Sequence, residues 1–378
     1  MLAPVRLLQA VKPSVAPALL VAIASSTAIF AATPFLLPAI AKEYEVSVGA
    51  VGWMSTTQLG GFVAASWVGG RFLRPIRSVF ITGAVLGVLA NLASAIAPTF
   101  EFLTAARFVS GVSLGLAAWI AWQAAFGDDQ KTGDVAVVGP LVGVVVAPGI
   151  SFLIQTFGVD WTFVVLAAAA GTPLLFARQV PKKDHLHPHR TRHASTRAAT
   201  AILIALGAIT LGGSSVFVYG AAIGEELNGL TPFTISLLYS ANALVAIPAA
   251  RWTGRRGPAG IWFIGTSICA IAIAGSRTGF IFSAALISWG FFFFMGIPAA
   301  FSLLAARSNF PEERAGDAQA VMALGRVFGP LMGGALLAAG STGALAFAAS
   351  ATMGSAAVLL LYIDRERFLV KRRPRILS

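Results

Sequence analysis

Two arginines, Arg107 and Arg326, lie inside long apolar stretches of this 378-residue chain. A charged side chain among apolar residues is costly to bury and is a candidate functional group wherever it occurs. A guanidinium presents its N–H donors in a planar fork, which suits bidentate contact with a carboxylate or a phosphate. Both arginines are therefore candidates for binding an anionic group. The alternative is structural, with Arg107 donating to backbone carbonyl oxygens and Arg326 bracing a helix bend.

Acidic side chains are absent from the middle of every apolar stretch. A proton-driven antiporter normally needs a carboxylate or a histidine whose protonation alternates with substrate binding, and the stretches offer neither. Two arginines without a nearby carboxylate give a positive local potential, which disfavours cationic substrates. The acidic residues nearest the stretches all fall at their ends: Glu43, Glu45, Glu101, Asp160, Glu225, Glu226 and Asp317.

All four histidines lie in one polar segment, at positions 185, 187, 189 and 193. Alternating histidines can bind zinc, nickel or copper, so a transition-metal exporter is one hypothesis. Transport of a metal ion would also require ligands along the path, and no histidine or carboxylate lies there. A solvated basic linker is the favoured interpretation, and we expect no metal site. The single cysteine, Cys269, excludes a disulfide within the chain.

The elements that must position these residues are apolar segments of membrane-spanning length. Hydrophobic residues make up 57% of the chain and charged residues 11%, unlike a soluble domain. A spanning helix needs ~20 mostly apolar residues. The first segment is too long for a signal peptide, so we expect a retained helix. The sequence predicts an all-α membrane protein with twelve transmembrane helices, at 17–40, 48–70, 79–98, 102–126, 134–157, 161–179, 199–223, 232–250, 258–276, 278–305, 317–340 and 343–363.

The basic residues are distributed unequally between the two sides of this arrangement. With the N-terminus inside, 23 of the 27 Lys and Arg residues fall in the inner segments, and only Lys42 and Arg277 fall in outer loops. This asymmetry is the positive-inside rule. It predicts a multi-pass protein of a bacterial cytoplasmic membrane with both termini in the cytoplasm. The net charge of +12 then indicates topology and contact with anionic lipid, and we expect no nucleic-acid partner.

A polar linker divides the chain into two sets of six helices. We expect an N-terminal bundle at 1–179, a basic, His-containing cytoplasmic linker at 180–198, a C-terminal bundle at 199–363 and a basic cytoplasmic tail at 364–378. A shift of roughly 180 residues aligns the halves, as in secondary transporters built from repeats. The basic loop after the second helix matches the loop after the eighth, and both are candidate cytoplasmic gates: Arg71, Arg74 and Arg77, and Arg251, Arg255 and Arg256.

Small residues and a proline recur in the fifth and eleventh helices. Small residues four apart allow a neighbouring helix to approach closely, and proline bends the helix. The pattern therefore predicts a conformational hinge in each half. The candidate hinge residues are Gly143 and Pro148 in the fifth helix, and Gly325, Gly329, Pro330, Gly333 and Gly334 in the eleventh.

Taken together, the spans, charge asymmetry, linker and repeat resemble the major facilitator superfamily over nearly the whole chain. The family's helix 4 motif is matched by Arg107 to Gly111, with Ser110 where the family often has glutamine. Its Gly-Pro motif is complete in the eleventh helix and degenerate in the fifth, where Ala147 and Ser151 replace glycines. The basic loop departs most, with Arg74 at the family's aspartate position. The resemblance implies two pseudo-symmetric six-helix bundles.

In that family, the first, fourth, seventh and tenth helices line a central cavity. The resemblance therefore implies a substrate-binding wall of aromatic and amide side chains, together with the two arginines. Such a wall suits an amphipathic or aromatic ligand. The alternative for each aromatic residue is contact with lipid. The candidate substrate-binding residues are Arg107, Trp119, Trp122, Gln123, Tyr219, Tyr239, Asn242, Trp289 and Arg326.

The function implied is secondary active transport, by rocking of the two halves around a central site. Because the resemblance links the Gly-Pro motif of the fifth helix to exporters, we expect efflux of a small amphipathic organic compound. Uptake or exchange of an organic anion through Arg107 and Arg326 is the alternative, and a non-transporting membrane sensor is a further one. We expect no enzyme, since no nucleotide loop or Ser/His/Asp set occurs. The expected chain is a monomer without cofactors, whose partners are the substrate, membrane lipids and a coupling ion of unspecified identity.

Overall fold

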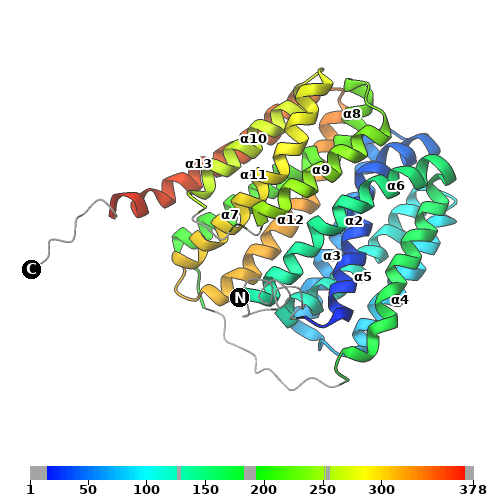
Figure 1. The fold of residues 1–378 in the computed structure, drawn as a ribbon, viewed down its shortest axis with the longest axis horizontal. Coiled ribbons are helices and arrows are strands. Elements are labelled where there is room, and N and C mark those ends of the chain that lie inside the picture. Colours follow the sequence, from blue (N-terminus) through cyan, green and yellow to red (C-terminus); the bar gives the residue numbers. More distant parts are fainter. Residues whose placement is uncertain (1–14, 126–128, 183–192, 251, 253–255, 371–378) are drawn as a thin grey trace, which may run out of the picture. The chain divides into compact units, whose positions relative to one another are not determined.

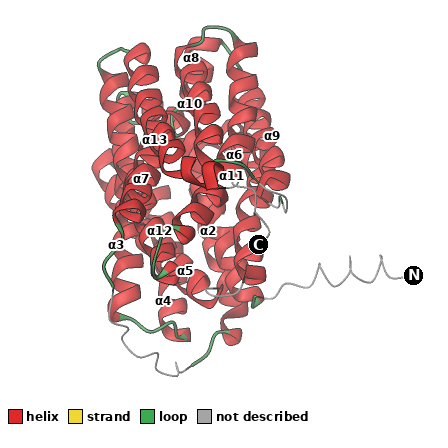
Figure 2. Cartoon of the chain, turned by 90° about the vertical axis from the view of Figure 1, so that its left-hand side faces the viewer, coloured by secondary structure: helices red, strands yellow, loops and turns green. Residues whose placement is uncertain are grey.

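The computed structural model describes residues 15–125, 129–182, 193–250, 252 and 256–370, and these residues form an all-helical protein (Figure 1). In Figure 2 every regular element of the described residues is a helix. The elements are α2 (Pro17–Glu43), α3 (Val48–Phe72), α4 (Arg77–Ala95), α5 (Phe100–Ala125), α6 (Asp129–Gly171), the 3-10 helix η1 (Thr172–Gln179), α7 (Arg197–Phe217), α8 (Gly220–Asn228), α9 (Pro232–Ala250), α10 (Ala259–Gly275), α11 (Gly279–Ala306), α12 (Pro311–Ala338) and α13 (Thr342–Val370).

The helices confirm the predicted fold class, with two differences in how the spans are divided. The fifth and sixth spans are joined in α6, whose 43 residues are about twice what one crossing needs. Gly158 has φ 84° inside α6, a left-handed conformation that glycine adopts at little cost, and it separates the two spans. The seventh span is interrupted at Val218 and Tyr219, between α7 and α8. Helix α13 continues to Val370, past the expected end at Ile363.

Length and composition support membrane insertion. Among the described residues, nine helices are long and apolar enough to cross a membrane, and α10 is a shorter apolar helix. A helix satisfies its own backbone hydrogen bonds, so it can lie in lipid without water. The chain is therefore a multi-pass membrane protein.

The chain forms two compact units. Unit 1 comprises residues 1–46 and 57–188, and unit 2 comprises residues 47–56 and 189–378. The division after residue 188 falls inside the expected linker at 180–198. Residues 47–56, the first part of α3, belong to unit 2 and pack against α12. This grouping was not expected from the sequence.

Alanines are frequent in the core of each unit, beside larger aliphatic side chains. In unit 1 the buried cluster includes Ala18, Ala22 and Ala121, and in unit 2 it includes Ala205 and Ala300. Small residues allow helix backbones to approach closely, and this packing stabilises helix contacts where lipid removes much of the hydrophobic driving force.

Candidate functional site

Helices α7 and α12 of unit 2 pack with almost no space between their backbones. A Cβ atom on Gly329 would overlap the Ser214 hydroxyl and lie 2.6 Å from the carbonyl oxygen of Leu211. A Cβ atom on Gly333 would overlap the Ser215 carbonyl oxygen, and Gly325 is equally restricted by α7. Three of the predicted glycines of the eleventh span, Gly325, Gly329 and Gly333, thus form one continuous contact with α7, which we call the α7–α12 seam.

The backbone of α12 accepts side-chain hydrogen bonds around its proline. Pro330 has no N–H, so the carbonyl oxygen of residue 326 lacks its usual helical donor. Hydroxyl groups from neighbouring segments donate to three carbonyl oxygens on this part of α12. The bonds are Ser214 Oγ to Gly325 O at 3.3 Å, Thr56 Oγ1 to Val327 O at 3.2 Å, and Tyr219 Oη to Pro330 O at 2.8 Å.

Tyr219 is held in a slot made by glycines of unit 2. Its side chain is fully buried, and a Cβ atom on Gly334 would lie 2.6 Å from its hydroxyl oxygen. Gly333 meets its ring, and Gly52 of the α3 segment meets its hydroxyl group. In this conformation the candidate substrate-binding tyrosine is part of the seam, so a ligand reaches it only if the seam opens.

Arg326 lies on α12, directly after Gly325 of the seam. Its side chain is half-buried. No described residue forms a hydrogen bond or ion pair with its guanidinium group. A charged group that is partly accessible and unpaired remains available to a ligand.

Tyr239 and Trp289, two other candidates of unit 2, form an aromatic cluster with Phe217, which was not predicted as a site residue. Phe217 lies 5.0 Å from the Tyr239 ring and 5.7 Å from the Trp289 ring, centroid to centroid. The Tyr239 hydroxyl donates to the Phe217 carbonyl oxygen at 2.7 Å, and Asn242 Nδ2 donates to the Leu286 carbonyl oxygen at 2.7 Å. Tyr239, Asn242 and Trp289 are thus together, buried and hydrogen-bonded or stacked within the unit.

Arg107 is buried between three helices of unit 1. Its side chain is 1% exposed, and one terminal nitrogen donates to Asn91 Oδ1 of α4 at 2.9 Å. The guanidinium carbon lies 4.9 Å from the centroid of the Phe163 ring of α6. Asn91 and Phe163 were not predicted as site residues, because nothing in an apolar helix pattern indicates which neighbour an arginine will meet.

The remaining candidates of unit 1 lie on α5 and α6. Trp119 and Trp122 pack against the alanine-rich core, while Gln123 is exposed. Gly143 and Pro148 are half-buried in α6. A Cβ atom on the adjacent Gly149 would meet nothing within 4 Å, so this part of α6 is less tightly restricted than α12.

Two of the basic-loop arginines bind the ends of helices. Arg77 donates to the carbonyl oxygen of Arg178, which lies within η1. It also donates to the carbonyl oxygen of Val180, just after η1, at 3.0 Å. Arg256 donates to the last carbonyl oxygens of α9, Ala249 at 2.6 Å and Ala250 at 2.9 Å. A cation is favourable at a helix C-terminus.

Partial burial lowers the pKa of Arg256, but a guanidinium group stays charged in proteins. Arg74 is exposed. The side chain of Arg71 and both Arg251 and Arg255 lie outside the described residues.

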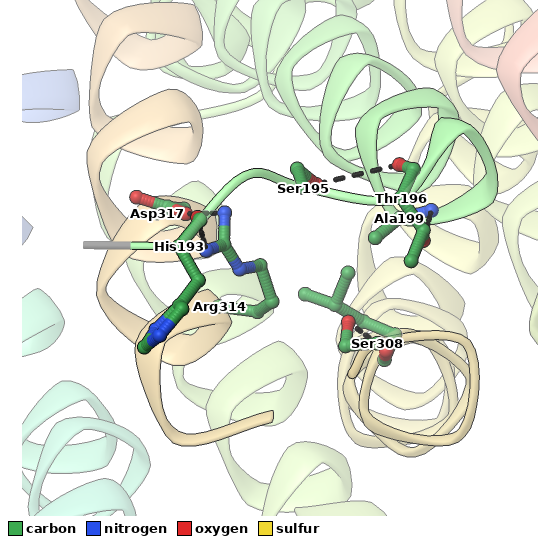
Figure 3. A network of polar contacts seen from close by, with 8 residues as sticks. His193, Ser195, Thr196, Ala199, Ser308, Arg314 and Asp317 are labelled. Carbon is green, nitrogen blue, oxygen red and sulfur yellow. Dashed lines mark hydrogen bonds and ion pairs between the residues drawn. The ribbon is translucent and has the colours of Figure 1, made fainter. Parts of the chain in front are cut away.

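The last residues of the expected linker, from His193 to Thr196, contact helices of unit 2 (Figure 3). The His193 ring stacks on Phe310 at 3.8 Å. Arg314 donates to the His193 carbonyl oxygen and to Asp317, both at 2.7 Å. Thr196 caps α7 by accepting from the Ala199 N–H and donates to the Arg307 carbonyl oxygen.

The other three histidines lie outside the described residues. Within the described ranges, no group of three His, Cys, Asp or Glu residues could hold a metal ion.

Comparisons with known proteins give a family from one family model and a fold from solved structures. A family model described as Major Facilitator Superfamily matches residues 18–324. The crystal structure of a mutant of the nucleoside transporter NupG has a TM-score of 0.66 and 12% identity, covering 92% of this chain and 98% of that one. A POT family transporter in complex with a thioalcohol-conjugated peptide has a TM-score of 0.70 and 13% identity, covering 94% and 96%. At this identity the structures show the fold alone. No curated protein matches the chain.

Proposed function

Because the chain belongs to the major facilitator superfamily, it is a multi-pass secondary transporter of a small molecule and not an enzyme, and we propose that it exports a small amphipathic organic compound that carries an anionic group. The observation that carries this proposal is Arg326. Its guanidinium group is half-buried, beside the α7–α12 seam, and has no partner among the described residues. A substrate carboxylate or phosphate would supply that partner.

The second buried arginine has a different environment. Arg107 is almost fully buried and already donates to Asn91. It therefore offers less to a substrate that enters from water. This contrast favours Arg326 over Arg107 as the contact for an anionic group.

The proposed transport step is alternating access, with the α7–α12 seam as the moving contact of unit 2. Glycine surfaces let two helices slide or bend without side-chain obstruction. The hydroxyl donors that bind the α12 backbone can change acceptors as the helix bends, so hydrogen bonds need not be lost. Opening of the seam would expose Tyr219, whose ring and hydroxyl group suit an amphipathic ligand.

The outward direction is supported by the Gly-Pro helices, a feature that the resemblance links to exporters. Uptake or exchange of an organic anion is the alternative direction for the same site. A counterflow measurement decides between them: proteoliposomes of known orientation are loaded with the bound compound, and its movement is followed after a gradient is imposed on each side in turn.

Replacement of Arg326 tests the substrate class. A ligand is first identified by thermal shift from a panel of organic anions, cations and neutral amphiphiles, since binding to the folded state raises the melting temperature. We expect Arg326→Gln to weaken binding of an anionic ligand roughly tenfold to a hundredfold, as expected for a lost charge-assisted hydrogen bond. Arg326→Lys should retain part of the affinity, because a point charge remains without the planar fork.

The exposed residue Phe328 on the same helix supplies the control. Phe328→Leu should leave the affinity at the parental value. If Arg326→Gln binds the ligand as tightly as the parent, or if only cations raise the melting temperature, the anion proposal is wrong. The buried aromatic cluster of unit 2 would then be the main recognition surface.

We propose further that both termini and the linker lie in the cytoplasm of a bacterial cell, as the distribution of basic residues predicts. In a Cys269→Ala background, Arg190→Cys should react with an impermeant thiol reagent only from the cytoplasmic side. Asn228→Cys, at the end of α8, should react only from outside. Labelling of intact cells and of inverted vesicles measures both, and the reverse pattern would overturn the orientation.

A further inference from the structure

The environment of Arg107 in unit 1 lacks both a counter-charge and enough hydrogen-bond acceptors. Its Nε atom is buried and has no hydrogen-bond partner. Asn91 accepts one of its bonds, and the Phe163 ring lies beside it, but neither carries a negative charge. Among the described residues no carboxylate pairs with it. A buried charge without a partner is strongly destabilising.

Three other buried donors lie near Arg107 on the same part of unit 1. The hydroxyl groups of Thr104 and Ser110 and the amide nitrogen of Gln58 have no hydrogen-bond partner. Thr104 and Ser110 stand three residues before and after Arg107 on α5, where side chains are neighbours at roughly 5–6 Å between Cβ atoms. The backbone of Gln58 meets Gly111, one turn further along α5. All four groups can donate hydrogen bonds, and the arginine adds one positive charge.

The internal repeat shows that the fold does not require an arginine here. In unit 2, Gly290 packs against the Asn242 backbone as Gly111 packs against Gln58. Four residues before Gly290 stands Leu286, which is fully buried. The Asn242 amide reaches the Leu286 carbonyl oxygen, whereas the Gln58 amide nitrogen has no partner. An apolar side chain therefore fills the equivalent place, and the unpaired donors are specific to unit 1.

A small cleft lies on the same helix contact as Arg107. One turn beyond Ser110, α5 contributes Ser113 and Leu114 to a small, partly open and mostly apolar cleft, which Ser25 and Ser26 of α2 also line. On α4, Gly87 meets Ser113 and Asn91 meets Arg107. The cleft and the arginine therefore lie on the same α4–α5 contact, about 9 Å apart along α5 at 1.5 Å per residue.

We propose that Arg107 binds a small inorganic anion, such as chloride, together with Thr104, Ser110 and Gln58. The anion neutralises the guanidinium group and accepts the hydrogen bonds that the protein leaves unmade. Water would accept some of these bonds but would leave the charge uncompensated. Glu43, Glu45, Glu101 and Asp160, the acidic residues of unit 1 whose side chains the structure describes, are exposed, so they do not replace an anion at this buried position.

Chloride is the probe for the test. Purified protein is placed in gluconate buffer, and chloride replaces gluconate at constant ionic strength, so that screening does not change. The parent should show a saturable rise in melting temperature of about 2 °C or more, as ligand binding to the folded state requires. Isothermal titration of chloride should give the same half-saturating concentration.

Variants assign the effect to the site. Arg107→Gln should abolish the chloride response. Ser110→Ala and Thr104→Val keep the guanidinium group and should raise the half-saturating chloride concentration roughly tenfold each, as loss of a bond to a charged partner predicts. Arg326→Gln, at the other arginine, should leave the response at the parental value.

Several results would overturn the proposal. Equal melting temperatures in chloride and gluconate for the parent would show that water alone satisfies the donors. An unchanged half-saturating concentration in both Ser110→Ala and Thr104→Val would place the anion elsewhere, even if Arg107→Gln does not fold. Loss of the response in Arg326→Gln would assign chloride to the proposed substrate contact instead.

Discussion

Replacing Gly329 or Gly333 with leucine should abolish transport while the protein still inserts and folds into a helical bundle. A leucine side chain on either glycine has no space, because even a Cβ atom would overlap Ser214 or the Ser215 carbonyl oxygen of α7. Overpacking of a tight contact costs about 1–3 kcal/mol or more. The two helices would be forced apart, and the Tyr219 bond to Pro330 would be lost with them. Substrate flux into proteoliposomes measures the loss.

Gly149 provides a matched control for this experiment. It follows Pro148 in the corresponding helix of unit 1, yet a Cβ atom there would meet nothing within 4 Å. Gly149→Leu should therefore transport at close to the parental rate. Parental transport by Gly329→Leu and Gly333→Leu would mean that the α7–α12 seam does not move during the cycle, and equal loss in Gly149→Leu would mean that the effect is not specific to close backbone contact.

The number and type of elements could be predicted because the bilayer restricts them. Each spanning segment needs an apolar run of one length, and this requirement is visible in the residues themselves. Where the predictions differ from the structure, local backbone geometry decides. Gly158, in a left-handed conformation, lies between the two spans of α6. The seventh span is interrupted at Tyr219, between α7 and α8. Neither feature is visible in an apolar pattern.

The environments of the candidate residues could not be predicted in the same way. Arg107 and Arg326 have similar apolar neighbours in the sequence, yet Arg107 is buried against Asn91, whereas Arg326 is half-exposed and has no partner among the residues that the structure describes. The difference arises from which helices cross near each arginine. That depends on the packing of α4 and α6 around α5, which helical periodicity alone does not encode.

A close helix contact leaves a pattern of small residues in the sequence. The spacing of the glycines in the eleventh span predicts such a contact, and three of them meet α7, while their role as a hinge stays a prediction. The partners across the contact, such as Thr56 and Gly52, come from a segment almost three hundred residues away. Hydroxyl donors to a backbone carbonyl leave little trace in sequence, since Ser and Thr are common in spanning helices.

The helix 4 motif leads to a second large effect, expected for Gly111→Ala. The new methyl group would overlap the Gln58 carbonyl oxygen, and the Gln58 Cα atom would lie 3.0 Å away. These are backbone atoms, so no side-chain rotation relieves the contact, and α3 and α5 must separate. We expect the melting temperature to fall by several degrees, from an overpacking cost of about 1–3 kcal/mol, and the yield of folded protein to fall with it.

Gly60→Ala is the matched control, because a Cβ atom on this α3 glycine would meet nothing within 4 Å. Alanine is a better helix former than glycine by roughly 1 kcal/mol in water, so this variant should melt at or above the parental temperature. Gly290→Ala, at the equivalent contact in unit 2, should fall as Gly111→Ala does. If Gly111→Ala melts with Gly60→Ala, the close approach of α3 and α5 is absent from the protein in solution.

The comparison separates the two residues of the motif by function. Gly111 and Gly290 make the same backbone contact in the two units, so the glycine serves packing in both. Arg107 stands where unit 2 has Leu286, so packing does not account for it. A fall in stability shared by both glycine variants, together with a chloride response that Arg107→Gln abolishes, would assign the helix crossing to the glycine and the anion to the arginine.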